Sequence, residues 1–198
     1  MILPQSITNF HSGFEPVPVN RYFARITRGN NLKDSTLDKM MSFRCESAEL
    51  PGRSHATNTQ QIYGPIRKIP YNSSFIDTTL TFMCSNNSGR ENKNVEDIAE
   101  KRYFDEWQDD IQDPDSFDVA YYDDLTGLVS VDILNEQNAT IYSVDMIEAF
   151  PLNVSSISLG WGQTNDYMKF SVTFSFRKWK KAKTEPTRSE RDMMRRLL

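Results

Sequence analysis

The sequence predicts a mainly β fold, in which an antiparallel β-sandwich or split barrel has one α-helix packed on it. Apolar and polar residues alternate over 76–84 and again over 168–179, which is the period of a strand that buries one face. The period changes to that of a helix over 95–111. With 198 residues, 38% hydrophobic and 25% charged, the chain is long enough for one domain with a sizeable core.

The first third of the chain predicts two strands and a long loop. Residues 21–28 (RYFARITR) have the aromatic and β-branched content of a strand, and 40–49 (MMSFRCESAE) is predicted as a second strand. The polar residues 29–39 between them predict a turn, and Leu50-Pro51-Gly52 ends the second strand. We predict a polar loop over 53–74, and a loop of this length in a compact domain is usually functional or contacts a partner.

A single amphipathic helix is predicted near 95–111. Glu100, Phe104, Trp107 and Ile111 follow one another at spacings of four, three and four, which places them on one stripe of a helix. We predict that Phe104, Trp107 and Ile111 anchor this helix to the sheet, because large apolar side chains gain most from burial.

Further strands are predicted after the helix. Residues 127–134 and 139–149 form a candidate hairpin, and 155–159 is a candidate short strand. Near the two ends, 6–12 and 189–198 are candidate short helices. The count of six or seven antiparallel strands with one central helix fits a sandwich or barrel.

The last strand, 168–179, has the clearest alternation. One face must pack in a core, since it consists of Phe170, Val172, Phe174 and Phe176. The opposite face consists of Lys169, Ser171, Thr173, Ser175 and Arg177. A sheet with this pattern has one apolar face and one that contacts water or a polar neighbour.

Charge is unevenly distributed along the chain. The net charge is −4, but residues 178–198 hold eight basic and three acidic residues, so 1–177 has a charge of −9. Residues 105–124 contain nine carboxylates and no Lys or Arg. An acidic body disfavours binding to a nucleic-acid backbone, because that affinity comes from neutralised phosphates. The acidic stretch is either a solvated surface or one that repels phosphate, and the basic end is interpreted as an exposed helix or docking arm.

The sequence lacks the motifs of common catalytic sites. It has no Gly-x-Ser-x-Gly elbow, no Walker loop, no Cys-x-x-Cys and no His-Glu-x-x-His. His11 and His55 lie in polar contexts and are predicted as surface residues. Asp113, Asp115 and Asp118 lack the glycine and the terminal glutamate of a calcium loop, so we interpret them as a solvated turn. We therefore predict no catalytic, cofactor-binding or metal-binding residue and no enzymatic activity.

Targeting and redox signals are equally sparse. The longest apolar runs are a few residues, which predicts no membrane anchor. The first residues have neither the basic start nor the apolar stretch of a secretory signal. Cys45 and Cys84 are predicted as buried thiols.

The order of the segments resembles the tail tube proteins of contractile-tailed bacteriophages, a family that includes the main tube subunit and the tube-initiating subunits of the baseplate. The resemblance extends from about residue 20 to residue 179. It rests on 20–26 (NRYFARI), 43–52 (FRCESAELPG), 64–71 (GPIRKIPY), 102–108 (RYFDEWQ), 149–154 (AFPLNV) and 170–179 (FSVTFSFRKW).

The resemblance implies a sandwich or split barrel that assembles into hexameric rings, whose inner strands form one continuous β-barrel. Stacked rings would form the inner tube of a contractile tail, surrounded by sheath, joined to baseplate and tape-measure proteins, and open to genomic DNA during ejection. It implies a virion protein assembled in the cytoplasm of the bacterial host. The polar face from Lys169 to Arg177 is then a candidate lumen face. Candidate inter-subunit residues on the long loop are Arg53, Tyr63, Arg67 and Lys68.

The predicted organisation is a single domain, residues 1–198. It comprises an N-terminal arm (1–19), a β core (20–179) and a basic C-terminal extension (180–198). Alternatives within the same fold are a baseplate tube initiator and the tube protein of a type VI-like injection system. Two other classes stay open at this point, a nucleic-acid-binding β-barrel that uses the basic tail and a carbohydrate-active enzyme on a β-sandwich.

Overall fold

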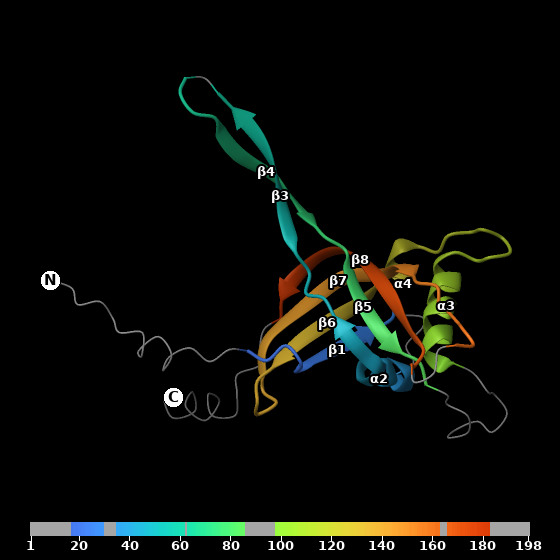
Figure 1. Cartoon of the computed structure of the whole chain (residues 1–198). Helices are drawn as coiled ribbons and strands as arrows, with labels where there is room; N and C mark the ends of the chain where they lie inside the picture. The colour runs from blue at the N-terminus through green and yellow to red at the C-terminus, as the bar shows by residue number, and fades with distance from the viewer. Residues whose placement is uncertain (1–16, 30–34, 62, 86–97, 163–165, 183–198) are drawn as a thin grey trace, which may run out of the picture.

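The computed structural model describes residues 17–29, 35–61, 63–85, 98–162 and 166–182. It shows a nearly closed six-stranded antiparallel barrel, from which a two-stranded hairpin projects (Figure 1). The strands are β1 (Tyr22–Thr27), β2 (Cys45–Ala48), β3 (Arg53–Gln60), β4 (Arg67–Phe75), β5 (Thr78–Met83), β6 (Gly127–Leu134), β7 (Thr140–Val154) and β8 (Lys169–Lys181). The helices are α2 (Ser35–Arg44), α3 (Ala99–Ile111) and α4 (Tyr122–Leu125).

The barrel sheet has the strand order β1-β6-β7-β8-β5-β2, and every neighbouring pair is antiparallel. Its two outer strands come together at one seam. There the single hydroxyl hydrogen of Tyr22 in β1 is shared between two main-chain oxygens of β2, that of Cys45, at 3.2 Å from the hydroxyl oxygen, and that of Glu46. This bond nearly closes the sheet, and closure protects strand edges that would otherwise pair with other chains.

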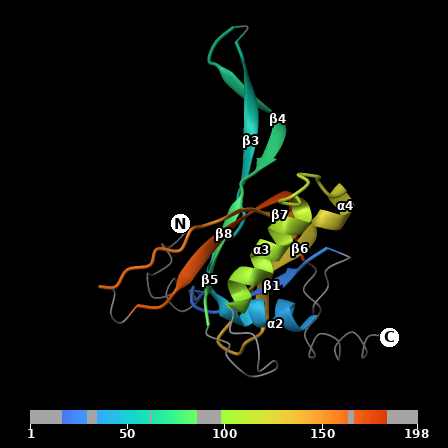
Figure 2. The ribbon, with the colours of Figure 1, turned by 90° about the vertical axis from the view of Figure 1, so that its right-hand side faces the viewer.

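The core lies on the inner face of the barrel and against α3. Phe170, Val172 and Phe174 of β8 are buried, as the alternation predicts. Phe104 of α3 contacts three of the core rings: its centroid is 4.9 Å from that of Phe82, 5.8 Å from Phe170 and 6.0 Å from Phe174. Figure 2 shows α3 lying across the strands, so the helix covers the aromatic part of the core.

Two predictions for 29–49 are wrong. Residues 40–44, predicted as part of a strand, belong to the helix α2, and the predicted turn over 29–39 includes the start of that helix. Only Cys45–Ala48 is a strand. The segment 38–44 has no β-branched residue, and Lys, Met and Arg favour helices. Burial of Met41 in the core then fixes the helix against β1.

The predicted loop over 53–74 is mostly a hairpin. Strands β3 and β4 pair from Arg53 opposite Phe75 to Gln60 opposite Arg67, with a bulge after Ala56. Both faces of the hairpin are exposed to solvent, so the regular alternation that indicates a half-buried strand is missing from the sequence.

The other boundaries differ less. Strand β7 continues through Pro151 to Val154, beyond the predicted end at 149, and the predicted strand over 155–159 is not one. The described part of the predicted helix begins at Ala99, and 95–97 lie outside the described residues, as do the predicted helices at 6–12 and 189–198. Cys45 and Cys84 are free thiols but only half-buried.

Candidate assembly surfaces

The β3–β4 hairpin is the most exposed part of the described chain. It rises clear of the barrel in two perpendicular views (Figures 1 and 2), and from Arg53 to Ser74 its described residues are exposed. Its tip and outer strand present large apolar side chains to solvent, namely Tyr63, Ile66, Ile69 and Tyr71. A hairpin of two strands is marginally stable in water by itself, so this one needs a firm root or a partner.

The root of the hairpin is fixed to the barrel by aromatic contacts. The Arg53 guanidinium lies over the Phe75 ring, 5.2 Å from its centroid, and over the Trp179 ring at 4.9 Å. The Trp179 indole N–H donates to the main-chain oxygen of Gly52 at 3.3 Å. Phe75 in turn contacts Phe176 of β8. These contacts orient the hairpin on the barrel.

The structure separates the four predicted inter-subunit residues into two groups. Arg53 is a root residue, whereas Tyr63, Arg67 and Lys68 lie at the outer end, where Gln60 is opposite Arg67. Among the described residues, neither Arg67 nor Lys68 has a carboxylate partner. From Arg53 to Phe75 the sequence has no Asp or Glu, so Arg53, Arg67 and Lys68 give the hairpin a net positive charge.

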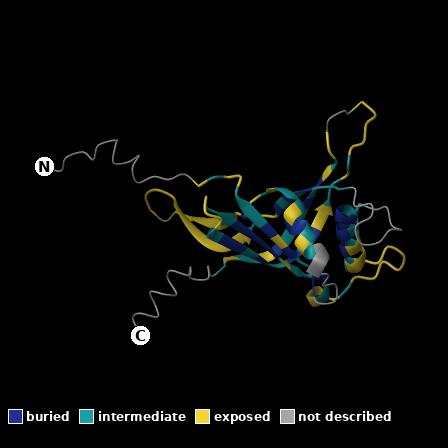
Figure 3. Ribbon diagram, turned by 90° about the horizontal axis from the view of Figure 1, so that it is seen from below, coloured by how far each residue is buried: buried dark blue, intermediate teal, exposed yellow. Residues whose placement is uncertain are grey.

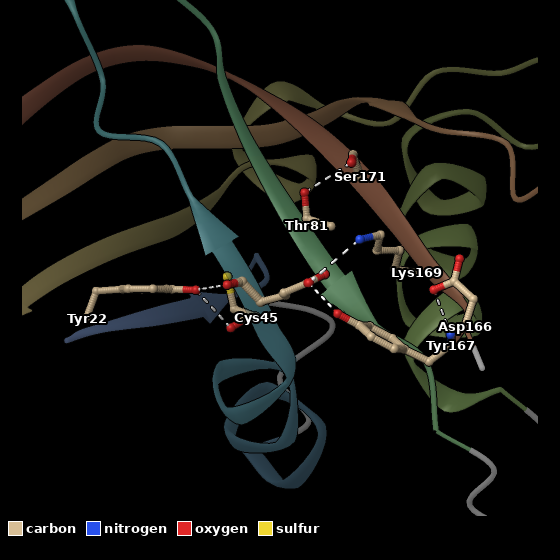
Figure 4. Close-up of polar contacts among 8 residues, drawn as sticks. Tyr22, Cys45, Thr81, Asp166, Tyr167, Lys169 and Ser171 are labelled. Carbon is tan, nitrogen blue, oxygen red and sulfur yellow. Dashed lines mark hydrogen bonds and ion pairs between the residues drawn. The ribbon is translucent and has the colours of Figure 1, made fainter. Parts of the chain in front are cut away.

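The polar face of β5 and β8 is lined by hydroxyl groups. Thr81 and Ser171 share a hydrogen bond of 3.1 Å, visible in Figure 4, and Thr79 and Thr173 are 3.4 Å apart. Ser175 continues this face and is half-buried. Figure 3 shows the exposed, half-buried and buried positions along the strands. The side chains of this face are therefore polar and small, in contrast to the aromatic side chains on the opposite face of the sheet.

The two basic residues of this face pair with carboxylates of their own chain. Lys169 Nζ is 3.7 Å from Glu46 Oε1, and Arg177 Nη1 is 3.0 Å from Glu148 Oε1. Glu148 stands at a left-handed bulge of β7, with φ of 57°. These pairs partly neutralise the positive charge of the face.

Glu46 joins three strands and a loop at the barrel seam, a role that the sequence did not indicate. Its carboxylate accepts the Tyr167 hydroxyl and faces Lys169, and its main-chain oxygen accepts the Tyr22 hydroxyl (Figure 4). Burial raises the pKa of Tyr22 to about 12 and that of the Cys45 thiol to about 12. Both groups are protonated at neutral pH, so Tyr22 is a donor and Cys45 is a poor nucleophile.

A second polar network, also not indicated by the sequence, lies on β1, β6 and β7. Asp132 accepts the Ser143 hydroxyl and pairs with Arg25 at 2.9 Å, while the Ser130 hydroxyl donates to Asp145 at 2.7 Å. Asp132, Ser130 and Ser143 are buried, and their polar groups are satisfied within the chain. The network thus stabilises the sheet.

Of the three predicted helix anchors, two are fully buried. Phe104 and Trp107 have no exposed surface, and the Trp107 indole N–H donates to the main-chain oxygen of Leu125 at 2.9 Å. Ile111 is partly buried against the same core. Gly127 is needed beside them, because a Cβ there would lie 2.3 Å from the Thr27 oxygen and 3.1 Å from Trp107 Cζ2.

The described residues contain no group of three or more His, Cys, Asp or Glu side chains that could hold a metal ion. His55 is an exposed hairpin residue that contacts the Ser73 hydroxyl at 3.1 Å, and His11 lies outside the described residues. No described helix has the length and apolar character needed to cross a membrane.

Comparison with known proteins identifies the fold and the family. The family model described as phage tail tube protein matches residues 7–182. Similar solved structures include one from the baseplate of the anti-feeding prophage (TM-score 0.60, 10% identity, covering 87% of this chain and 99% of that one). Two others come from an extracellular contractile injection system named PVC. One is its sheath–tube complex (TM-score 0.55, 16% identity, covering 90% and 99%) and the other its sheath/tube terminator (0.58, 16%, 86% and 99%).

These structural similarities show that the nearly closed barrel with its packed helix is a tube-protein fold. No curated protein matches the chain. The family match spans most of the sequence, so the chain belongs to the phage tail tube protein family. Its function is that of a structural tail tube protein, as the order of the sequence segments predicts.

Proposed function

We propose that the chain is the main tube subunit of a contractile phage tail. Six copies form a ring, rings stack into the inner tube, and genomic DNA leaves through the lumen without sequence-specific contact. The protein then acts only as a structural element and has no enzymatic activity.

The observation that carries this proposal is the β3–β4 hairpin. It is anchored at its root, exposed along its length and apolar at its tip. A projection with exposed Tyr63, Ile66 and Tyr71 has no purpose in an isolated subunit, since it exposes apolar surface to water without gain. A contact with a neighbouring copy, in the same ring or the next one, gives it a role.

The polar face of β5 and β8 supports the lumen assignment. A sheet that encloses an aqueous channel needs an apolar outer face for packing and a polar inner face for water. The hydroxyl groups of Thr81, Ser171 and Thr173 meet this requirement, and they are neutral, so they bring no positive charge that would hold a phosphate. The acidic body of the chain also disfavours trapping of DNA.

The proposed partners are sheath, baseplate and tape-measure proteins, and the proposed location is the virion, after assembly in the cytoplasm of the bacterial host. The similar structures include a sheath–tube complex and a baseplate, which support sheath and baseplate as partners at the level of fold. The second candidate is a tube initiator of one baseplate ring or the tube protein of an injection system. The similar structures favour it because one comes from a baseplate and another from the sheath–tube complex of an injection system.

A shortened hairpin tests the proposal. Residues 56–72 are replaced by Asn-Gly, which joins the paired residues His55 and Ser73 through a two-residue turn and keeps the root intact. We expect a monomer that unfolds at the same denaturant concentration as the wild type but forms no tubes in electron microscopy. Glu136→Ala, in an exposed turn elsewhere, is the control and should assemble normally. Normal tubes from the shortened chain would contradict the proposal.

A further inference from the structure

The hairpin and one other surface of the same chain have complementary chemistry. The loop after α3 is closed by a bridge between Gln112 and Val119 and by a 3.1 Å hydrogen bond from Asp113 N to Asp118 O. Apolar side chains protrude from this loop and the residues after it: Phe117 is 71% exposed, Val119 66% and Tyr121 85%. An exposed apolar cluster of this kind on a soluble subunit marks an interaction surface.

Carboxylates flank these apolar side chains in the sequence, and five of them form no ion pair with a Lys or Arg of the described residues. At the start of the acidic stretch, Asp105 pairs with Lys101, and Glu106 pairs with Arg28 and Arg102. Further along, within the described part of the chain, no Lys or Arg forms an ion pair with Asp109, Asp113, Asp115, Asp118 or Asp123. We define the acidic aromatic surface as these five carboxylates with Phe117, Val119 and Tyr121.

The hairpin is the counterpart of this surface in both respects. It presents Tyr63, Ile66 and Tyr71 as exposed apolar groups, and Arg67 and Lys68 as cations with no carboxylate partner in the described residues. Its strands have 8 and 9 residues, which approaches the roughly 20 to 30 residues that one side of a standard protein interface supplies. Complementary charges with apolar groups between them fix the register of such an interface.

We propose that the β3–β4 hairpin of one copy binds the acidic aromatic surface of a second copy, with Arg67 and Lys68 facing Asp115 and Asp118. The two surfaces do not meet within one chain, because the hairpin rises away from the barrel (Figures 1 and 2). Because the contact joins two different surfaces of the chain, it can repeat from copy to copy head to tail, either around a closed ring or along an open stack. This inference rests on the proposed function, since it names the partner of the hairpin in the tube.

Asp115 and Asp118 are the best carboxylates to test. The Asp113 carboxylate accepts the main-chain N–H groups of Asp115 and Ser116 and so shapes the loop. The side chains of Asp115 and Asp118 accept no hydrogen bond within the described chain, so their charge can be reversed without loss of a local contact.

A charge exchange in the full-length chain tests the contact. Arg67→Glu with Lys68→Glu, and separately Asp115→Lys with Asp118→Lys, should each lower the yield of sedimentable tubes by about tenfold or more, because like charges then meet. The four substitutions together should restore the yield to within about threefold of the wild type. Carbodiimide cross-linking of wild-type tubes should join Lys68 of one copy to Asp115 or Asp118 of another.

Two controls make the outcomes distinct. Glu136→Lys adds an exposed positive charge elsewhere and should neither lower the yield nor rescue Arg67→Glu with Lys68→Glu. Thermal melting of each variant checks that the subunit still folds. The inference is overturned, and the proposed function is left intact, if the wild type forms tubes but the fourfold variant does not recover the yield. The same holds if wild-type tubes give no cross-link from Lys68 to this loop. A wild-type chain that forms no rings or tubes even with its baseplate would instead count against the proposed function.

Discussion

At the scale of single residues, Trp107 illustrates how the helix is held on the barrel. Its ring is fully buried, lies 6.2 Å from the Phe174 ring and stacks on Phe104 at 6.5 Å. Its indole N–H satisfies the Leu125 carbonyl just before β6 begins. One side chain therefore joins helix, sheet and the connection between them.

We expect Trp107→Ala to lower the free energy of unfolding by about 3–5 kcal/mol, because it leaves a large cavity and an unpaired carbonyl. Urea denaturation followed by far-ultraviolet circular dichroism measures this loss. Trp161→Ala is the matched control: Trp161 is fully exposed, so its removal should change stability by less than about 0.5 kcal/mol. A Trp107→Ala chain as stable as the control would refute the packing of α3.

At the scale of elements, the seam between β1 and β2 depends on a titratable group. The Tyr22 hydroxyl bridges the two outer strands, and burial, followed by the nearby Cys45 and Glu46, raises its pKa to about 12. The folded state therefore favours the neutral phenol. Its contribution to stability is complete below pH 10, the ordinary value, and is lost as the pH rises toward 12.

Tyr22→Phe should remove this contribution at neutral pH. We expect a loss of about 1 kcal/mol in the free energy of unfolding at pH 8, typical of one hydrogen bond. The difference between wild type and Tyr22→Phe should shrink as the pH rises from 10 to 12, because the wild-type phenol then ionises. Denaturant melts of both chains across this range provide the measurement, and a difference that stays constant with pH would show that the hydroxyl does not stabilise the seam.

The elements also show what the sequence could predict. The strands β5 and β8 were predictable because one face of each packs on the aromatic core and the other is polar, so burial leaves an alternating pattern. Helix α2 was missed because it is short and its only fully buried apolar residue in the described part is Met41. The hairpin was missed because neither of its faces packs on the core of its own chain, and such a strand has no alternation.

For the candidate surfaces too, part could be predicted from the sequence and part could not. Alternation alone indicated the polar face from Lys169 to Arg177, since its residues alternate with the buried positions of the strand. The Glu46–Tyr167 contact joins residues 121 positions apart, and the pairing of Lys169 and Arg177 with in-chain carboxylates depends on strand register. Composition and spacing contain no information on such pairs. The sequence therefore predicts which face is polar but not how its charges are balanced.

At the scale of the whole molecule, the two faces of the sheet need different surroundings: one packs in an apolar core and the other contacts water or a polar neighbour. The aromatic face is covered within the subunit by α3, whereas the hydroxyl face of β5 and β8 stays partly open to solvent. The order of segments indicated the tail tube family where no single motif did, and the family match confirms it. In a ring of copies, uncovered polar faces that meet around one axis enclose water, which is the proposed lumen.

This assignment predicts selective labelling of the polar face. Lys169 is about half exposed, and its pair with Glu46 is solvent-screened, so Lys169→Cys should cost less than about 1 kcal/mol. In monomers, this thiol should react with a small maleimide and also with a maleimide attached to a polymer of about 5 kDa. The polymer is chosen to be too bulky to enter a narrow channel. In assembled tubes, the small reagent should still react, while the polymer reagent should react only at tube ends.

The native thiols give little background in this experiment, because burial raises the pKa of both Cys45 and Cys84. Glu136→Cys, in an exposed turn, is the control. It shows whether assembly keeps the polymer reagent away from every exposed thiol or only from the polar face. If the polymer reagent modifies Lys169→Cys equally in tubes and monomers, the face lies outside the tube. If neither reagent reaches it in tubes, the face is buried between subunits. The hydroxyl-lined face lies on the channel only if two results hold together: access to Lys169→Cys in its tubes depends on reagent size, and Glu136→Cys stays open to the polymer in tubes of its own.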